Sequence, residues 1–532
     1  MNDTMRQLSE LDASFLYLES DTTPMHIGGL YLFDGSHRSE PLRFEQFRTF
    51  LERRLHLAAF FRQKILQVPL NLDRPYWVDD EDFDLDHHLS HISLEGNGSM
   101  EELKALAESL LAEPLPRERP LWHVTYIDGL GEDPNLPEKA FAIVARVHHA
   151  AVDAFSGEEV MGKLLEYTPD APMPARHHWQ PEASPSTTRL AAQASLNVIQ
   201  RPFKLASIAR DAASATLHGL VMQYLGRLPL SRDLFRAPRT PFNRNLSNQR
   251  RIVTQEIELA RLKELKATLG ADITLNDVVL GVCAEALKRY LNQHEALPER
   301  SLVALTPISV RSKSLRRPTG NQMSAMLLSL ATDEPDPARR VQKISQNARV
   351  SESYQQAIAA DRLTELLPPT MLALSARLYS EFQLAQRYKP VFNLPITNVP
   401  GPQVPLYLQG ARLVRQINSA PLFDGAGLVI LAVSYEGSIN FNITLCPELI
   451  PDGDQLAVLI DESVDAIEEA ATNLPAGDVP DEPDEGAEDA ALLDDLRSHL
   501  DQWLTRVTQP FRQSGETGTN EEEAPVSEKE PK

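Results

Sequence analysis

The spacing of apolar residues over the first 180 positions predicts strands that alternate with helices. A nearly continuous apolar run at 141–147 has the length and composition of a buried strand. At 44–58 the apolar residues instead recur at every third or fourth position, and a second helical pattern at 99–113 begins with the N-cap residue Ser99. Strands that alternate with helices indicate an α/β layer. We expect further strands at 26–35 and 121–130.

The second half of the chain is also predicted to combine strands with helices. A strong helical pattern covers 275–293, with Asn276 as the expected N-cap. A hairpin is predicted at 427–449 with its turn at Glu436 and Gly437, because apolar residues alternate with Asn and Thr in its second arm. We expect further strands at 250–259 and 301–311.

Composition changes at two places along the chain. A Pro- and Ser-rich stretch at 169–188 is typical of a linker, and the residues after Asn473 are rich in Asp, Glu, Pro and Gly. Within that last segment, the apolar residues of 491–507 share one helical face, which we expect either to dock on the body or to meet a lipid surface. The expected segments are an N-terminal domain at 1–180, a basic helical and extended linker at 181–247, a C-terminal domain at 248–473 and a mostly disordered acidic tail at 474–532.

Charge is distributed unevenly over the 532 residues, whose net charge is −23. Sixteen acidic and five basic residues give −11 to the segment 478–532, whereas eleven basic and two acidic residues give +9 to 186–251, which we call the basic island. The island is expected to meet an anionic partner, or else to be a packed linker with a solvated basic face. No nucleic-acid partner is expected, because the overall charge is negative and no nucleic-acid-binding motif is present.

The location of the protein is constrained by three further features. No run of about eighteen apolar residues predicts a membrane span. The N-terminal residues lack the charged and apolar regions of a secretory signal. Cys283 and Cys446 are expected to be free thiols rather than a disulfide. We therefore expect a cytoplasmic protein.

Candidate chemistry is concentrated where the strand at 141–147 ends. His148 and His149 leave that strand, and Asp153 follows four residues after His149. Because successive side chains of a strand point in opposite directions, one ring is expected to face a substrate and the other to point into the structure. An oriented imidazole can act as a general base near neutral pH. The alternative from this segment alone is a pair of structural histidines in a turn; no metal site is expected, since no other ligand pattern accompanies them.

The stretch HHAAVDAFSG at 148–157 resembles the HHxxxDG motif of the bacterial wax ester synthase/acyl-CoA:diacylglycerol acyltransferase family. Its last position is Ala154 where the family usually has Gly, which puts the geometry of the loop in question more than the identity of the base. Other stretches resemble family motifs in the same order, over nearly all of residues 8–470. They are LSELDASFLYLESDTTPMHIGGL (8–30), RERPLW (117–122), LNDVVL (275–280), PISVR (307–311), GNQMS (320–324) and NVPGPQVPLYLQGARL (398–413) followed by Gly425 to Gly427.

The resemblance implies a role for each motif residue of the first half. His149 would take the proton of the acceptor hydroxyl, His148 would support it, and Asp153 would hold the loop, with Arg311 as its partner. The PLW motif residues would shape a substrate-binding wall, or else pack in the core. These residues are Pro120, Leu121 and Trp122.

The ND motif falls at the start of the helix predicted over 275–293. Asn276 would orient the substrate or donate to the developing oxyanion, and the alternative is that it only caps the helix. Asp277 would be a structural acceptor near the helix N-terminus.

For the whole chain, the resemblance implies an α/β fold of two CoA-dependent-acyltransferase-like domains joined by a long linker, with an active-site tunnel between them. The implied reaction moves a long-chain acyl group from acyl-CoA to diacylglycerol or a fatty alcohol, with acyl-CoA as a substrate and no cofactor. The expected surroundings are a membrane or lipid-body surface at which the protein is peripherally bound. Two alternatives stay open: a CoA-dependent acyltransferase for a polar acceptor, and a non-catalytic lipid-surface protein.

Overall fold

The structure is a computed structural model. It describes residues 6–69, 73–131, 133, 136–151, 164–177, 179–186, 188, 190, 237–309, 323–358 and 390–473. All of them belong to the first of two units into which the chain divides, Met1–Leu474 and Pro475–Lys532. The predicted helix at 491–507 and most of the basic island lie outside the described residues.

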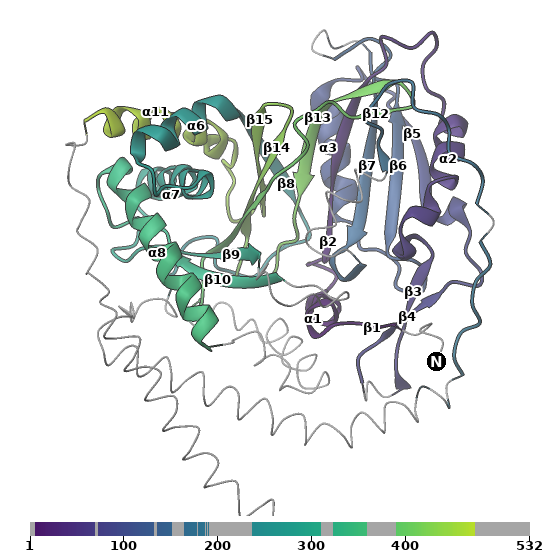
Figure 1. Ribbon diagram of the computed structural model, residues 1–532, viewed down its shortest axis with the longest axis horizontal. Helices are drawn as coiled ribbons and strands as arrows, with labels where there is room; N and C mark the ends of the chain where they lie inside the picture. Colours follow the sequence, from purple (N-terminus) through teal and green to yellow (C-terminus); the bar gives the residue numbers. More distant parts are fainter. Residues whose placement is uncertain are drawn as a thin grey trace, which may run out of the picture. The chain divides into compact units, whose positions relative to one another are not determined.

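One six-stranded sheet carries the predicted strands of the first half, and helices cover both of its faces (Figure 1). Tyr31 and Phe33 point to the face packed against α2, whereas Leu30 and Leu32 point to the face packed against α3, since successive side chains of a strand alternate. The strands, in sheet order, are β12 (Tyr407–Leu408), β13 (Ala411–Ser419), β2 (His26–Asp34), β7 (Phe141–His148), β6 (Trp122–Asp128) and β5 (Leu89–Ser93), and the helices are α2 (Phe44–Glu52) and α3 (Met100–Ala112).

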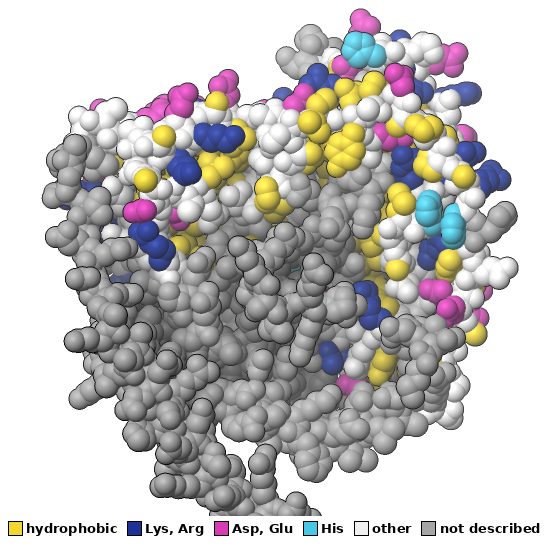
Figure 2. Space-filling model, viewed as in Figure 1, with side chains coloured by type: hydrophobic (Ala, Val, Ile, Leu, Met, Phe, Trp, Pro, Cys, Tyr) yellow, Lys and Arg dark blue, Asp and Glu magenta, His cyan; other side chains and the backbone are white. Residues whose placement is uncertain are grey.

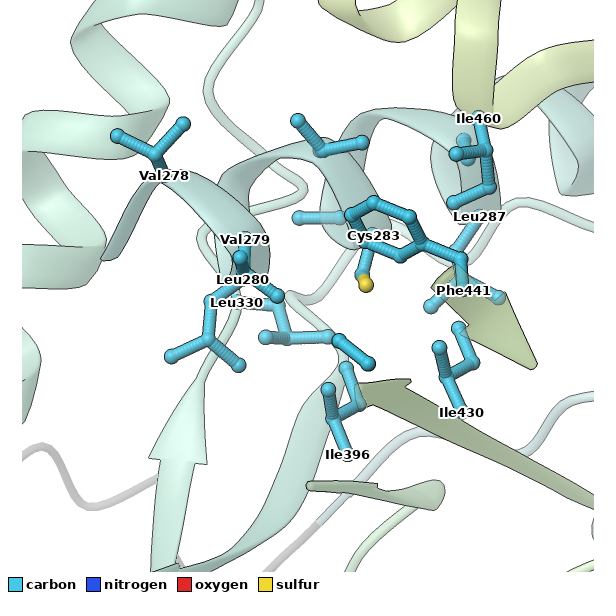
Figure 3. Close-up of a cluster of buried hydrophobic side chains, with 14 of the residues drawn as sticks. Val278, Val279, Leu280, Cys283, Leu287, Leu330, Ile396, Ile430, Phe441 and Ile460 are labelled. Atoms are coloured by element: carbon cyan, nitrogen blue, oxygen red, sulfur yellow. The ribbon is translucent and has the colours of Figure 1, made fainter. Parts of the chain in front are cut away.

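A second six-stranded sheet carries the predicted strands of the second half, and four of the described helices cover it. Its core is almost wholly aliphatic: Val279, Cys283 and Leu287 of α7 pack against Ile430 and Phe441 of the sheet (Figure 3). The strands, in sheet order, are β10 (Met323–Ser329), β9 (Val303–Ser309), β11 (Leu394–Val399), β14 (Leu428–Tyr435), β15 (Ser438–Leu445) and β8 (Arg251–Glu258), and the helices are α6 (Leu259–Leu269), α7 (Leu275–Gln293), α8 (Pro337–Ile358) and α11 (Asp454–Thr472).

Short elements complete the described fold. A small sheet of β1, β4 and β3 lies near helix α1, and single turns of 3₁₀ helix connect the longer elements. These elements are β1 (Arg6–Gln7), α1 (Glu10–Leu18), η1 (Leu55–Leu57), η2 (Ala59–Phe61), β3 (Gln63–Leu66), β4 (Tyr76–Asp79), η4 (Leu85–His87) and η5 (His149–Ala151).

Most predicted elements are confirmed, including the mixture of strands and helices in both halves. The hairpin of β14 and β15 turns at Glu436 and Gly437, whose φ angles of 45° and 85° are those of a primed two-residue turn. The helix predicted at 44–58 ends at Glu52, and the apolar stripe continues because buried Leu55 lies in the 3₁₀ turn η1. Both cysteines are free and buried, as expected.

The expectation that Asn276 caps α7 is wrong, because the N-cap is Thr274. Thr274 has an extended backbone (φ −92°, ψ 161°), and its Oγ1 accepts a hydrogen bond from the Asp277 N–H at 3.1 Å. Asp277 Oδ2 in turn accepts from the Thr274 N–H at 2.8 Å. This reciprocal capping box satisfies two helix-end donors, which a cap at Asn276 would not do.

One feature of the first sheet was not expected from the order of the chain. Strands β12 and β13 come from the segment predicted as the C-terminal domain, yet β13 pairs with β2 in the first sheet. The pairing covers the edge of β2 that would otherwise be open. Near the C-terminal end of β13, the Asn418 N–H donates to Asn442 Oδ1 of the second sheet at 2.8 Å. The domain boundaries at 180 and 248 stay a prediction.

Candidate functional site

The two adjacent histidines lie where β7 passes into η5, and hydrogen bonds fix the main chain on both sides. The His148 N–H donates to the Leu121 carbonyl at 2.9 Å, and the His149 N–H donates to the Met25 carbonyl at 2.8 Å. The first bond joins the segment to the start of β6, and the second joins it to the residue before β2. These two bonds therefore fix the main chain from which both rings project.

His148 points into the structure, with only 1% of its surface exposed. Its Nδ1 accepts a hydrogen bond from the Ala150 N–H at 3.0 Å, so the proton of the neutral ring is on Nε2. That nitrogen lies 3.5 Å from Oε1 of Glu19. The ring of His148 thus stabilises the following turn through Nδ1 and faces the carboxylate of Glu19 with Nε2.

Glu19 is a buried carboxylate with several donors around it. Arg117 binds Oε2 through Nε at 2.8 Å and Nη2 at 2.6 Å, and the Met25 N–H donates to Oε1 at 3.2 Å. Burial by itself raises the pKa of the Glu19 carboxyl, but His148 and Arg117 outweigh burial and lower the pKa to about 2. Glu19 is therefore a permanent negative charge beside His148.

His149 is half-buried and lies against a second aromatic ring. The ring of Phe15, from α1, is stacked on it with the centroids 3.9 Å apart and the planes at 17°. No other described residue hydrogen-bonds to the buried Nδ1, which leaves Nε2 as the nitrogen that can meet a substrate. Burial, with a smaller contribution from the His148 ring, lowers the pKa of His149 to about 4. The ring is neutral at neutral pH and has a free lone pair.

Two of the predicted site residues, Asp153 and Arg311, lie outside the described residues, and so does Ala154 at the motif position where the family usually has Gly. Asn276 and Asp277 are described and lie at the start of α7. Asn276 Oδ1 accepts a hydrogen bond from Nδ2 of Asn398 at 3.3 Å, and Asp277 is the acceptor in the capping box. Among the described residues, no hydrogen bond joins either of them to the histidines.

The PLW residues lie at the start of β6, and Leu121 among them contacts the segment that carries the histidines. Leu121 has no exposed surface and packs with Ala150 in one cluster, and its carbonyl holds His148. Trp122 is 2% exposed, stacks on His88, and donates from Nε1 to the Phe61 carbonyl at 3.0 Å. Pro120 is also buried. All three residues are buried, and a substrate wall built from them stays a prediction.

The residues that sequence reasoning missed are those that contact the two histidines or their neighbour Glu19: Phe15, Glu19, Met25 and Arg117. All four belong to stretches quoted for the resemblance, 8–30 and 117–122, but nothing in their spacing assigns them to the histidines. In the stretch FLYLE (15–19), the carboxylate of Glu19 directly follows apolar residues, and this position could have indicated a buried charge that needs partners.

Neither a metal site nor a membrane-spanning helix is found in the described part of the chain. No group of three or more His, Cys, Asp or Glu residues there could hold a metal ion. Of the described helices, none combines the length and the apolar character needed to cross a bilayer. A cavity of about 420 Å³ lies at the start of α2, against Phe44, His91 and Tyr126, and neither His148 nor His149 lines it. The expected tunnel stays a prediction.

Two family models match the chain over most of its length. The wax ester synthase/diacylglycerol acyltransferase catalytic domain matches residues 8–279, and the WS/DGAT C-terminal domain matches residues 319–468. The first match contains the histidines, Glu19 and the ND motif.

Known proteins are similar over the same region. A Mycobacterium tuberculosis protein provisionally named diacylglycerol O-acyltransferase is 32% identical over 479 residues, covering 89% of this chain and 92% of its own length. The O-acyltransferase WSD of Acinetobacter baylyi is 30% identical over 474 residues, covering 87% and 97%.

Solved structures share the fold. The wax ester synthase/diacylglycerol acyltransferase of Marinobacter aquaeolei VT8 superimposes with a TM-score of 0.61 at 26% identity, covering 88% of this chain and all of that one. A starter condensation domain of rhizomide synthetase, in complex with C8-CoA, superimposes with a TM-score of 0.53 at 15% identity, covering 88% and 96%. The second likeness concerns the fold alone.

Proposed function

We infer the chemistry of this protein from one fact: the chain belongs to the wax ester synthase/diacylglycerol acyltransferase family. It is an acyl-CoA-dependent O-acyltransferase. We propose that it moves a long-chain acyl group to the hydroxyl of a diacylglycerol or a fatty alcohol, which gives a triacylglycerol or a wax ester. The observation that carries the proposal is the half-buried, neutral ring of His149 at the end of β7.

His149 is the general base in this proposal. Its Nε2 accepts the hydroxyl proton while the alcohol oxygen forms a bond to the thioester carbonyl carbon. The tetrahedral intermediate then breaks its carbon–sulfur bond, and the proton on His149 passes to the departing sulfur of CoA. The ester and free CoA result, and no covalent acyl-enzyme is needed.

The low pKa of His149 acts differently on the two halves of this cycle. A ring that stays neutral at pH 7 always has its lone pair available for the incoming hydroxyl. Once protonated in a buried place, the same ring is a stronger acid than an ordinary imidazolium and gives its proton more readily to sulfur. Burial of the site therefore favours proton return, and it makes the ring a weaker base for proton removal.

The remaining motif residues have supporting roles in the proposal. His148, beside the charged Glu19, holds the turn that carries the base. Asp153, with Arg311 as its partner, would hold the rest of the loop, and Asn276 would orient the substrate or donate to the oxyanion. These last three roles come from the family resemblance.

The lipid substrates imply a lipid surface. Diacylglycerols and fatty alcohols reside in membranes and lipid bodies, so we propose that the protein works in the cytoplasm and associates peripherally with such a surface. Acyl-CoA is a substrate in this scheme, and the proposed chemistry requires neither a metal nor a bound cofactor.

The test is CoA release from palmitoyl-CoA, with hexadecanol, a diacylglycerol and a small amine as separate acceptors. We expect release with the two lipid alcohols and a loss of at least about a hundredfold in His149→Ala. His91→Ala is the control, since His91 is half-exposed and paired with Asp128 at 2.8 Å away from the site. Turnover by a folded His149→Ala protein at near the normal rate would refute the base, and release with the amine alone would favour the polar-acceptor alternative.

A further inference from the structure

Helix α1 brings one aromatic side chain directly onto the proposed base. Phe15 and His149 are both half-buried, and their rings are stacked 3.9 Å apart at 17°. The two residues are 134 positions apart in the chain, so the contact is made only by the fold. Such stacked pairs have a defined geometry, unlike the contacts of aliphatic side chains.

The His149 ring has few other restraints. Its main chain is held by the bond to the Met25 carbonyl, but no other residue in the described ranges hydrogen-bonds to the ring itself. In many catalytic sites a carboxylate or a carbonyl oxygen of another residue fixes the plane of the base. Here the flat face of Phe15 is the described contact that can define that plane.

Phe15 is itself mounted rigidly enough for this task. Ser9 caps α1 by accepting a hydrogen bond from the Asp12 N–H at 3.0 Å, and the Phe15 carbonyl accepts from the Glu19 N–H at 3.2 Å. On the inner side of the helix, Ala13 and Leu16 pack in one cluster with Leu121 and Ala150. The helix is therefore fastened to the same turn that carries His149.

We propose that Phe15 is a positioning residue for the reaction, which holds the His149 ring in the plane needed for proton transfer and keeps water from one of its faces. The inference rests on the proposed role of His149 as the base. The helix α1 then has a function in catalysis although it presents no reacting group of its own.

The experiment compares Phe15→Leu with Phe15→Tyr in the palmitoyl-CoA and hexadecanol assay. Leucine keeps an apolar side chain but removes the stacked plane, so we expect kcat to fall about tenfold with KM within about twofold, since a misplaced base slows chemistry more than binding. In the pH dependence of kcat, the apparent pKa of the acid limb should rise towards the ordinary histidine value, because water reaches the ring. Phe15→Tyr keeps an aromatic ring at this position, so kcat and the apparent pKa of the acid limb should stay at their wild-type values.

The matched control is Phe44→Leu. Phe44 is also half-buried and stacks on a histidine, His91, with the centroids 5.1 Å apart at 11°, but it lies at the start of α2. The same substitution there should leave kcat and the acid limb unchanged. If Phe15→Leu does not fold, as judged by its circular dichroism, Phe15→Met replaces it under the same criteria.

The outcomes separate the inference from the proposed function. A Phe15→Leu enzyme with unchanged kcat and an unchanged acid limb, alongside an inactive His149→Ala, overturns the positioning role and leaves the base intact. An active His149→Ala overturns the base and the positioning role together. A fall in kcat that Phe15→Tyr does not restore, without movement of the acid limb, assigns Phe15 to packing and also overturns the inference.

Discussion

At the scale of residues, two neighbouring histidines have opposite surroundings. His148 is enclosed and faces the charged Glu19, whereas His149 is half-buried, with an apolar ring on one face. The alternation of side chains along a strand, read from the sequence, predicted that one ring would point inward. The identity of the neighbours was not predictable, because Phe15, Glu19 and Met25 reach the site only through the pairing of β2 with β7 and the packing of α1 on η5.

Buried neutral histidines predict that the protein loses stability in mild acid. Burial lowers the pKa of His26 to about 3 and that of His149 to about 4. Between these values and the unfolded value near 6.5, the unfolded chain binds protons that the folded chain excludes, so the free energy of unfolding falls as pH falls. Each group contributes a slope of about 1.4 kcal/mol per pH unit near pH 5.

Urea unfolding at pH 7.5, 6 and 5 measures this slope. Burial lowers the pKa of His123 to about 4 as well, so His149→Gln removes one of several titrating groups, and the slope should decrease by about 1.4 kcal/mol per pH unit. The Glu19 carboxyl, whose pKa is lowered to about 2, adds a further loss only below about pH 4.5. A free energy of unfolding that stays constant from pH 7.5 to 5 contradicts the prediction.

At the scale of elements, the spacing of apolar residues predicted a helix or a strand correctly where a single period extends through the segment. The helix at 275–293 was predicted with its observed limits, and the hairpin predicted at 427–449 forms over 428–445 with its turn at Glu436 and Gly437 as expected. The expected N-cap of α7, Asn276, was wrong: both Asn and Thr are common N-cap residues, but only Thr274 has an acidic residue, Asp277, at the capping-box spacing.

The capping box gives a prediction for α7. Thr274→Ala removes the acceptor of the Asp277 N–H, and we expect a loss of about 1 kcal/mol in the free energy of unfolding. The control is Thr268→Ala in α6, whose hydroxyl bonds only to the Glu264 carbonyl within the helix. There the change should stay within about 0.5 kcal/mol, since alanine is the better helix former. Equal effects of the two substitutions on urea unfolding would rule out the cap.

At the scale of the whole molecule, charge separates one segment from the body. The described surface in Figure 2 intersperses Lys and Arg with Asp and Glu, whereas the basic island at 186–251 carries +9 within a chain of −23. Most of the island lies outside the described residues, so its role follows from its composition alone. An anionic lipid surface is the partner that also fits the proposed substrates.

Neutralising part of the island should weaken binding to vesicles. We expect Arg201→Gln with Lys204→Gln to bind vesicles rich in phosphatidylglycerol at least about tenfold more weakly at low salt, since each basic residue near such a surface contributes about 1 kcal/mol. The control is Lys263→Gln with Lys266→Gln on α6, which removes the same charge elsewhere. Co-sedimentation with vesicles in 20 mM salt and in high salt measures the effect. Binding that depends on neither salt nor the Arg201 and Lys204 substitutions argues against an electrostatic surface contact.

Local rules, which act within a few neighbouring residues, were enough to predict β2, β6 to β9, α2, α3, α7, the hairpin turn and the histidine pair at the end of β7. Contacts between distant segments could not be obtained in this way: β13 completes the first sheet from some 380 residues beyond β2, and Phe15 lies on His149 across 134 positions. Periodicity specifies which face of an element is apolar but not which element covers it. For that reason the base could be named from its motif, while the surroundings that keep it neutral and oriented emerged only from the packing of the folded chain.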